Sequence, residues 1–421
     1  MISLLKLREK LFYGWVVVVA LFISGMTLVG VQYSFGVFFK FIEAEFSLSR
    51  VMTSSVLSIS LLVGCAFRVL GGWGLDRYGP RVILFLMGIF TGLGLLLTGQ
   101  TGAVWQLFIT YSLIFPIGTS ASYTVSMSTV SRWFNKRRGL ALGITSAGPA
   151  FGIVIMPPLA TLLISVLDWR AAYVVIGLIV WLIIIPVSIL LKKDPSEIGT
   201  LPDGVKPAVS AEQLSEPRLE TAERQHTGLS LVQSLRTTSF WLFSFIWILF
   251  GFTIHFVSTH LVPHTTDIGF SAVEAATVLS LIGAATLAGR VLLGILSDKI
   301  GRKTTLILCS VIRAIMLLWL VWAQELWMLY LFALVYGFTT GGFGPIMAAL
   351  ITETFGLRKL GVLIGALDIG FGVGAAIGPA VGGLIFDIEQ SYSLAFIIGA
   401  LTMLVTGLLI ALVRRETNRN S

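Results

Sequence analysis

Three charged side chains are clear cases of charge placed deep inside long apolar stretches of the sequence, where a charge is costly and usually marks function. They are Arg68, Arg290 and Asp368. A guanidinium stays charged and offers a planar fork of donors that fits a carboxylate. A carboxylate held out of water beside an anion takes up a proton more readily, or pairs with an arginine. These residue types suit the binding of a small organic anion together with the transfer of a proton.

A second pattern occurs twice, at a spacing of 222 residues, as "RVLGGWGLDRYGPR" from Arg68 and "RVLLGILSDKIGRK" from Arg290. Glycine lets neighbouring helices approach, and aspartate accepts hydrogen bonds from a helix N-terminus or pairs with arginine. Ordinary loop charge would explain the basic residues but not the glycine and aspartate spacing. We therefore predict a latch at one membrane face. Its residues are Gly72, Asp76, Arg77, Gly79, Arg81, Gly294, Asp298, Gly301 and Arg302.

The composition indicates a membrane protein. Of 421 residues, 56% are hydrophobic and 12% charged, whereas soluble domains carry about a quarter charged residues. The apolar runs are long enough to cross a bilayer as helices and lack the alternation of barrel strands. The predicted fold is therefore all-α, with twelve transmembrane helices. They lie near 14–38, 51–75, 81–98, 104–131, 139–165, 171–191, 239–263, 272–297, 304–322, 326–351, 360–385 and 391–413.

The chain divides into two similar halves. A second match, at a spacing of 221, pairs Phe134 with Phe355 and Pro158 with Pro379. Residues 192–237 are rich in proline and mixed charge and read as a cytoplasmic linker, with a short surface helix near 209–225. We predict six-helix bundles over 1–191 and 238–421. Repeated twelve-helix chains are a transporter architecture with a central binding site between rocking halves.

Lysine and arginine predict the orientation. If the N-terminus is inside, most of the 29 lysine and arginine residues lie in inner segments, and Lys40, Arg50 and Arg170 lie outside. This follows the positive-inside rule and places both termini in the cytoplasm of a multi-pass protein, such as one of a bacterial inner membrane. The net charge of +8 then reflects topology and anionic lipid, so nucleic acid is not an expected partner. The basic N-terminus is expected to be uncleaved.

Several stretches resemble one family of transporters. The glycine and aspartate pattern of Gly72 to Arg81 resembles the loop motif of the major facilitator superfamily. "YGWVVVVALFIS", "GVQYSFGVFFK", "RWFNKRRGLALGITSAG", "DPSEIGTLPDG" and "LRTTSFW" resemble the monocarboxylate transporters and the related oxalate:formate antiporters. The resemblance implies proton-coupled or exchange transport of small organic anions by alternating access.

The resemblance also implies a site. In the related carriers, an arginine at the position of Arg290 binds the substrate carboxylate. Tyr33 and Tyr123 align with cavity tyrosines of the oxalate carriers, while Tyr336 and Phe343 are weaker aromatic candidates. Of the two histidines in the outer part of the seventh helix, His260 is the candidate substrate or proton contact, although a solvated role is more common there. Arg313 is expected on the peripheral side of its helix, without a role.

Arg68 and Asp368 depart from the relatives and have nearly equal predicted depth. The facilitator fold implies that their helices face each other, so we expect a pair between the halves. A competing role for Asp368 is uptake of the coupling proton. Animal monocarboxylate carriers have a lysine at Tyr33 and oxalate carriers one near Leu367. If Arg68 is paired, one cation remains, and a monocarboxylate is favoured. If Arg68 is not paired, a dicarboxylate such as oxalate is again a candidate substrate.

Other classes fit less well. The four histidines, two isolated cysteines and few buried acids provide no enzyme site, disulfide or metal cluster, and no nucleotide-binding motif occurs. We therefore expect no cofactor and no enzyme activity. The expected partners are a small carboxylate, protons or a counter-anion, and the lipid bilayer. A drug or sugar carrier and a non-transporting acid sensor remain alternatives, and the oligomeric state is open.

Overall fold

The computed structural model describes residues 12–134, 137–204, 231–355 and 360–414. These residues are helical or lie in turns and connections, and none of them forms a strand. Within the described ranges, twelve segments are long and apolar enough to cross a membrane. The prediction of an all-α chain with twelve spanning helices is therefore confirmed. The expected surface helix near 209–225 and both chain ends lie outside the described residues.

The chain forms two compact units. The first comprises Met1–Phe46 and Ile59–Ala208, and the second Ser47–Ser58 and Val209–Ser421. Each unit is described by itself below. The short segment Ser47–Ser58 precedes most of the first unit in the chain but packs with the second.

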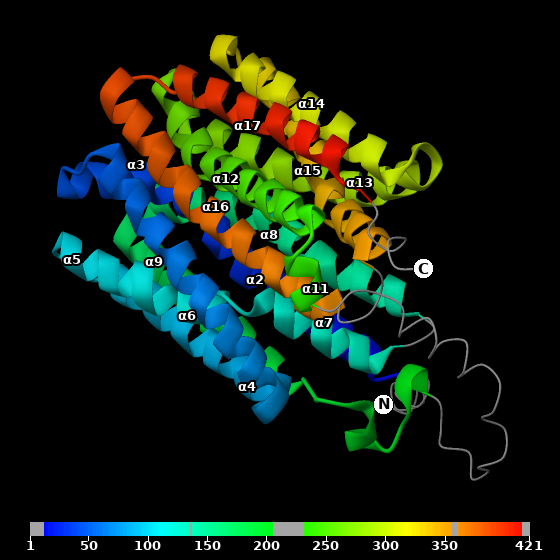
Figure 1. Cartoon of the computed structure of the whole chain (residues 1–421). Coiled ribbons are helices and arrows are strands. Elements are labelled where there is room, and N and C mark those ends of the chain that lie inside the picture. The colour runs from blue at the N-terminus through cyan, green and yellow to red at the C-terminus, as the bar shows by residue number, and fades with distance from the viewer. Residues whose placement is uncertain (1–11, 135–136, 205–230, 356–359, 415–421) are drawn as a thin grey trace, which may run out of the picture. The chain divides into compact units, whose positions relative to one another are not determined.

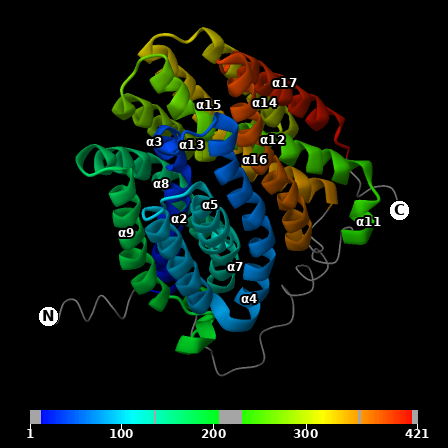
Figure 2. The same ribbon diagram turned by 90° about the vertical axis from the view of Figure 1, so that its left-hand side faces the viewer.

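Helices of the first unit are shown from blue to green in Figures 1 and 2. The first span holds α2 and α3, and the fourth is assembled from α5, a π-helical turn, α6 and α7. Asp168 caps α9 by accepting a hydrogen bond from the Ala171 amide at 2.7 Å. The bounds are α2 Gly14–Tyr33, α3 Phe35–Phe46, α4 Arg50–Thr98, α5 Val104–Leu107, the π-turn Phe108–Ile114, α6 Phe115–Thr119, α7 Ser122–Trp133, α8 Arg138–Val166 and α9 Trp169–Ile189, followed by 3₁₀ turns Pro195–Ile198 and Pro202–Gly204.

Helices of the second unit pack in pairs. α12 lies along α16, α13 along α15, and α14 along α17 (Figure 1). Ser271 and Glu274 form a reciprocal capping box at the start of α13. The bounds are α11 Leu231–Leu235, α12 Thr238–Asp267, α13 Ala272–Ile300, α14 Arg302–Trp322, α15 Leu326–Phe355, α16 Leu360–Glu389 and α17 Ser393–Leu412.

Candidate functional site

Arg290 lies in the middle of α13 and is half-buried. The Thr286 hydroxyl, one turn earlier, donates to the carbonyl of Gly337 in α15 at 3.1 Å. Nearby, a Cβ added to Gly341 would lie 3.0 Å from the Arg290 amide nitrogen, so α13 and α15 approach at backbone distance there. This close packing fixes the helix that carries the guanidinium. Eight residues separate Arg290 from Asp298, about 12 Å along the helix.

Tyr336 and Phe343, the aromatic candidates on α15, lie in the core of the second unit. Tyr336 is 2% exposed and Phe343 fully buried. The Tyr336 hydroxyl accepts a hydrogen bond from Arg313 Nη2 at 3.0 Å. The Phe343 ring stacks on Phe250 of α12, with centroids 4.0 Å apart. Both candidates thus contact other parts of the same unit.

Arg313 of α14 is fully buried, so the peripheral position expected from the sequence is wrong. Its guanidinium carbon lies 4.9 Å from the Phe250 ring centre, 4.8 Å from Tyr336 and 5.9 Å from Phe343. Among the described residues, no carboxylate pairs with it. The π-faces of the rings and one phenol therefore stabilise this cation.

His260 is also fully buried, in α12. Its Nδ1 atom lies 3.0 Å from the Tyr392 hydroxyl, and its Nε2 atom lies 2.8 Å from the Pro379 carbonyl oxygen in α16. The solvated position that is common for histidine at a helix end is therefore not the one found. His260 belongs to a hydrogen-bonded network inside the second unit.

The remaining candidates are distributed over both units. In the first unit, Tyr33 ends α2 and is half-buried, Arg68 in α4 is half-buried, and Tyr123 in α7 is 63% exposed. In the second unit, Asp368 in α16 is half-buried. The expected pair of Arg68 and Asp368 would join residues of different units and stays a prediction.

The first copy of the latch motif is organised around Asp76. Its carboxylate accepts a hydrogen bond from Arg132 Nη2 of α7 at 2.8 Å. Lys193 donates to the Asp76 backbone carbonyl at 2.6 Å. The chain turns at Gly79, whose φ of 81° favours glycine. Arg77 lies over the Trp73 and Tyr78 rings, and both Arg77 and Arg81 are solvent-exposed.

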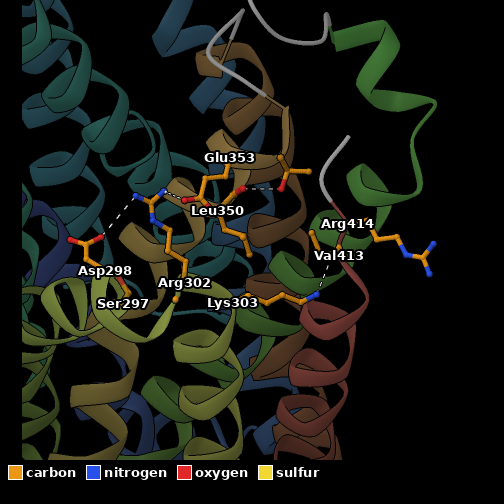
Figure 3. A pocket seen from close by; sticks show the side chains of 10 residues that line it. Ser297, Asp298, Arg302, Lys303, Leu350, Glu353, Val413 and Arg414 are labelled. Carbon is orange, nitrogen blue, oxygen red and sulfur yellow. Dashed lines mark hydrogen bonds and ion pairs between the residues drawn. The ribbon is translucent and has the colours of Figure 1, made fainter. Parts of the chain in front are cut away.

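In the second copy, a relay of three charged side chains, Asp298, Arg302 and Glu353, forms an ion-pair network, which is shown in Figure 3. Arg302 lies between two acids, with Nη1 at 2.9 Å from Glu353 and Nη2 at 4.0 Å from Asp298. Arg302 also donates to the Ala349 carbonyl at 3.1 Å. Gly301, with φ 93°, makes the preceding turn. The relay borders a cavity of about 490 Å³ that is also lined by Lys303 and Arg414.

The two copies of the predicted latch motif have opposite charges at one equivalent position. Arg132 of the first unit and Glu353 of the second have the spacing of 221 that relates Phe134 to Phe355. Asp76 pairs directly with Arg132, whereas Asp298 would repel Glu353. Arg302 contacts both acids and resolves this conflict. Sequence reasoning missed Arg132 and Glu353, although the repeat spacing relates them.

Comparison with known proteins identifies the family. The model of the Major Facilitator Superfamily matches residues 21–301 and 261–421. The chain belongs to the major facilitator superfamily. Among its relatives, Monocarboxylate transporter 13 of Rattus norvegicus is 27% identical over 403 residues, covering 95% of this chain and 89% of the relative. Monocarboxylate transporter 12 of Homo sapiens is 23% identical, covering 96% and 80%.

Solved facilitator structures agree on the fold. A D-xylose-proton symporter matches with a TM-score of 0.76 and 16% identity, covering 96% of this chain and 99% of that one. A bacterial homologue of the human lysosomal transporter Spinster matches with a TM-score of 0.66 and 16% identity, covering 95% of each. The predicted facilitator fold and the resemblance to monocarboxylate transporters are confirmed. This facilitator is a multi-pass membrane transporter, and its relatives are transporters rather than enzymes.

Sequence reasoning also missed polar groups of this facilitator at one end of the second unit. The sequence predicts Arg50 only as a charge in an outer loop. In the structure the residue is 6% exposed, and its Nη1 atom lies 2.6 Å from the Asp267 carboxylate. Its Nη1 atom also donates to the Tyr392 hydroxyl at 2.7 Å. A basic residue in a predicted outer segment, against the positive-inside bias, was the signal that could have singled it out.

Proposed function

We propose that this facilitator carries small organic monoanions of the lactate, pyruvate or formate type by alternating access, coupled to protons or to a counter-anion. The observation that carries the proposal is Arg290, a cation held within an apolar spanning helix. A guanidinium there attracts a carboxylate and can bind both of its oxygens. The printed names of the relatives, monocarboxylate transporters over nearly the whole chain, support the same substrate class.

Other parts of the proposed site have unequal support. Tyr33 and Tyr123 remain candidate substrate contacts, because neither phenol is fully buried. Tyr336 and Phe343 are better understood as groups that hold Arg313 and Phe250, since they are buried against them. Asp368 and Arg68 remain candidates for proton coupling or mutual pairing. With both termini in the cytoplasm, the latch motifs lie on the inner face.

A dicarboxylate such as oxalate is the second candidate. Arg68 is a further cation within a spanning segment and is only half-buried, so it could bind a second carboxylate. The choice between the candidates depends on whether Asp368 neutralises Arg68. Transport of the two substrate classes by the same preparation separates them.

The experiment is uptake of labelled lactate, formate and oxalate into proteoliposomes. We expect saturable lactate or formate uptake that is faster when the outside is more acidic, or when the vesicles contain an exchangeable monoanion. Saturable uptake of oxalate alone would favour the dicarboxylate carrier. If none of the acids is taken up under either condition, the proposal is wrong.

Arg290 is tested with matched variants. Hydrogen bonds to a charged group contribute about 1.5–3 kcal/mol, so Arg290→Ala should raise the KM for the acid by about tenfold or more. Arg290→Lys should retain part of the affinity, because it keeps the charge but loses the fork. Val291→Ala is the control, since Val291 is the next residue of α13 and 62% exposed. Unchanged uptake by well-folded Arg290→Ala protein would refute the site.

A further inference from the structure

A continuous set of hydrogen bonds links a partly exposed acid to the buried His260. Arg50 donates to both carboxylate oxygens of Asp267, at 2.6 and 3.0 Å, and to the Tyr392 hydroxyl at 2.7 Å. The Tyr392 hydroxyl then contacts His260 Nδ1 at 3.0 Å. The Asp267 side chain is 26% exposed, whereas His260 is fully buried. The Tyr392 hydroxyl therefore connects the charge state of His260 to the hydrogen bonds that bind Arg50.

The same network holds the start of α4 against α12 and α16 within the second unit. Asp387 of α16 accepts hydrogen bonds from the Arg50 and Val51 amides, both at 2.8 Å. The Arg50 guanidinium lies 3.6 Å from the Phe386 ring centre. Two acids and an aromatic ring thus fix the first residues of a helix that continues from Ser58 into the first unit.

The hydrogen-bond partners determine which histidine tautomer is present. A carbonyl oxygen only accepts, so His260 Nε2 must donate to Pro379 and carry a hydrogen. The Tyr392 oxygen accepts from Arg50, and its own hydrogen is then available to Nδ1 of His260. Neutral His260 therefore satisfies every contact in this set without conflict.

Protonation of His260 would break this agreement. The added proton sits on Nδ1, which then donates to the Tyr392 oxygen, and the phenol hydrogen must turn to another acceptor. Asp267 is an acceptor in the same network, because it shares the Nη1 donor of Arg50 with the phenol. Positive charge on His260 also repels Arg50. Both effects weaken the bond between Arg50 and Asp267. The only covalent bond that forms is the Nδ1–H bond of His260, whose proton comes from water, and Arg50 keeps its charge.

We propose that His260 is a proton-binding site, and that its protonation releases Arg50 and the start of α4 from their contacts with α12 and α16. The inference deepens the proposed function by naming an acceptor for the coupling proton, and its transport role rests on that function. The titratable and charged groups around His260 are Arg50 on α4, Asp267 and His264 on α12, Asp387 on α16, and Tyr392 before α17. The carboxylates of Asp267 and Asp387 favour a positive charge on His260, and Arg50 opposes it.

Ser54 offers a reporter for this release. Ser54 is fully buried in α4, and a Cβ on Gly383 of α16 would lie 2.5 Å from its hydroxyl oxygen. Met52, half a turn earlier on the same helix, is 44% exposed. In a background with Cys65→Ala and Cys309→Ala, the variants Ser54→Cys and Met52→Cys are labelled with a maleimide in nanodiscs at pH 7.5 and 5.5. The ratio of their rates cancels the pH dependence of the thiol reaction.

We expect the ratio of Ser54→Cys to Met52→Cys labelling to rise by about tenfold at pH 5.5, as expected for loss of one charged hydrogen bond. His260→Gln should abolish the rise, because the amide does not take up the proton. Tyr392→Phe keeps the ring but removes the connection to Arg50 and should also flatten the ratio. His264→Gln is the matched control, one turn away on α12, and should keep the rise.

The outcomes separate this proposal from the proposed function. A ratio that does not change with pH in the otherwise native protein, or a rise that persists in His260→Gln, overturns the proton site. If the labelling responds as expected but no carboxylate is taken up by proteoliposomes, the proton site stands and the proposed function is wrong. If uptake is driven by acid while the ratio stays flat, the transporter is supported and its proton acceptor lies elsewhere.

Discussion

At the scale of single residues, the second unit stabilises two buried arginines by different means. Arg50 has two carboxylate oxygens of Asp267, a phenol and the Phe386 ring, whereas Arg313 has three aromatic rings and a phenol but no carboxylate among the described residues. Removing one partner of a buried ion pair leaves the other charge uncompensated and costs about 3–5 kcal/mol. Aromatic rings carry no charge, so removing a cation from among them leaves no charge behind.

Arg313 and Tyr336 allow a clear test of this difference. Tyr336→Phe removes the hydroxyl that Arg313 Nη2 contacts at 3.0 Å, so it should destabilise the fold by about 1–3 kcal/mol. In an Arg313→Met background, the same change should have little effect, because the phenol then keeps only a 3.4 Å contact with the Thr253 carbonyl. The measurement is a double-mutant cycle of melting temperatures in detergent.

Phe332→Leu provides the control for this cycle. The Phe332 ring stacks on Tyr336, with centroids 5.0 Å apart, so its loss perturbs packing without removing the hydrogen bond. Its effect should be similar with or without Arg313. Equal effects of Tyr336→Phe in both backgrounds would contradict the assigned contact.

Counting residues in the sequence predicts how deep a charged residue lies within a spanning helix. It does not predict which residues the charge contacts. The position of Arg290 within its helix follows from counting residues to Asp298. The burial of Arg313 is marked by a polar face of α14 rather than by depth, because Thr305, Cys309 and Ser310 lie on the same side of the helix and are buried with it. Arg50 lies 217 residues from Asp267 and 342 from Tyr392, so neither contact has a local signal.

At the scale of elements, the two copies of the predicted latch motif show how a repeated turn accepts different neighbouring charges. Gly79 and Gly301 both adopt positive φ, so the turn itself is preserved in the two units. The acid at the preceding helix end meets arginine in one unit and another acid in the other. Arg302, which directly follows the turn glycine, provides the missing cation in the second unit.

Glu353→Gln should therefore weaken the second latch more than Asp298→Asn. Glu353 lies 2.9 Å from Arg302 and is 34% exposed, whereas Asp298 lies 4.0 Å away and is 72% exposed. For a pair screened to this degree, the expected loss is about 1 kcal/mol or less, or about 2–4 °C in melting temperature. Glu353→Asp should recover part of it. A larger loss in Asp298→Asn than in Glu353→Gln would show that the relay is misassigned.

Hydropathy predicts where most of the spanning helices lie, but it does not predict where they end. The first span was expected over 14–38 but continues to Phe46, because Lys40, Glu43 and Glu45 lie where a helix can leave the hydrocarbon region without losing its backbone hydrogen bonds. The fourth span was expected over 104–131 as one uniform helix. Its π-helical turn at Phe108–Ile114 leaves the apolar character unchanged and so gives no hydropathy signal.

At the scale of the whole molecule, the sequence repeat and the contacts divide the chain at slightly different places. The repeat predicts a single division at the linker, and this division stays a prediction. Ser47–Ser58 is the exception, because Asp267 and Asp387 hold its amides and its arginine in the second unit. The sequence repeat shows which parts of the two halves are similar in sequence, whereas a compact unit is defined by the contacts between its residues.

The orientation in the membrane decides which solution reaches the His260 network. The positive-inside rule predicts that the ends of α12 and α16 that hold Asp267 and Asp387 lie outside, so external acid should act on His260. Without Cys65 and Cys309, Gln100→Cys and Glu325→Cys should react with an impermeant maleimide in intact cells. Leu201→Cys and Lys299→Cys should react only after permeabilisation. All four positions are exposed, so solvent access within the protein is matched. The reverse labelling pattern would mean an inverted topology, and the cytoplasmic pH would then control the network.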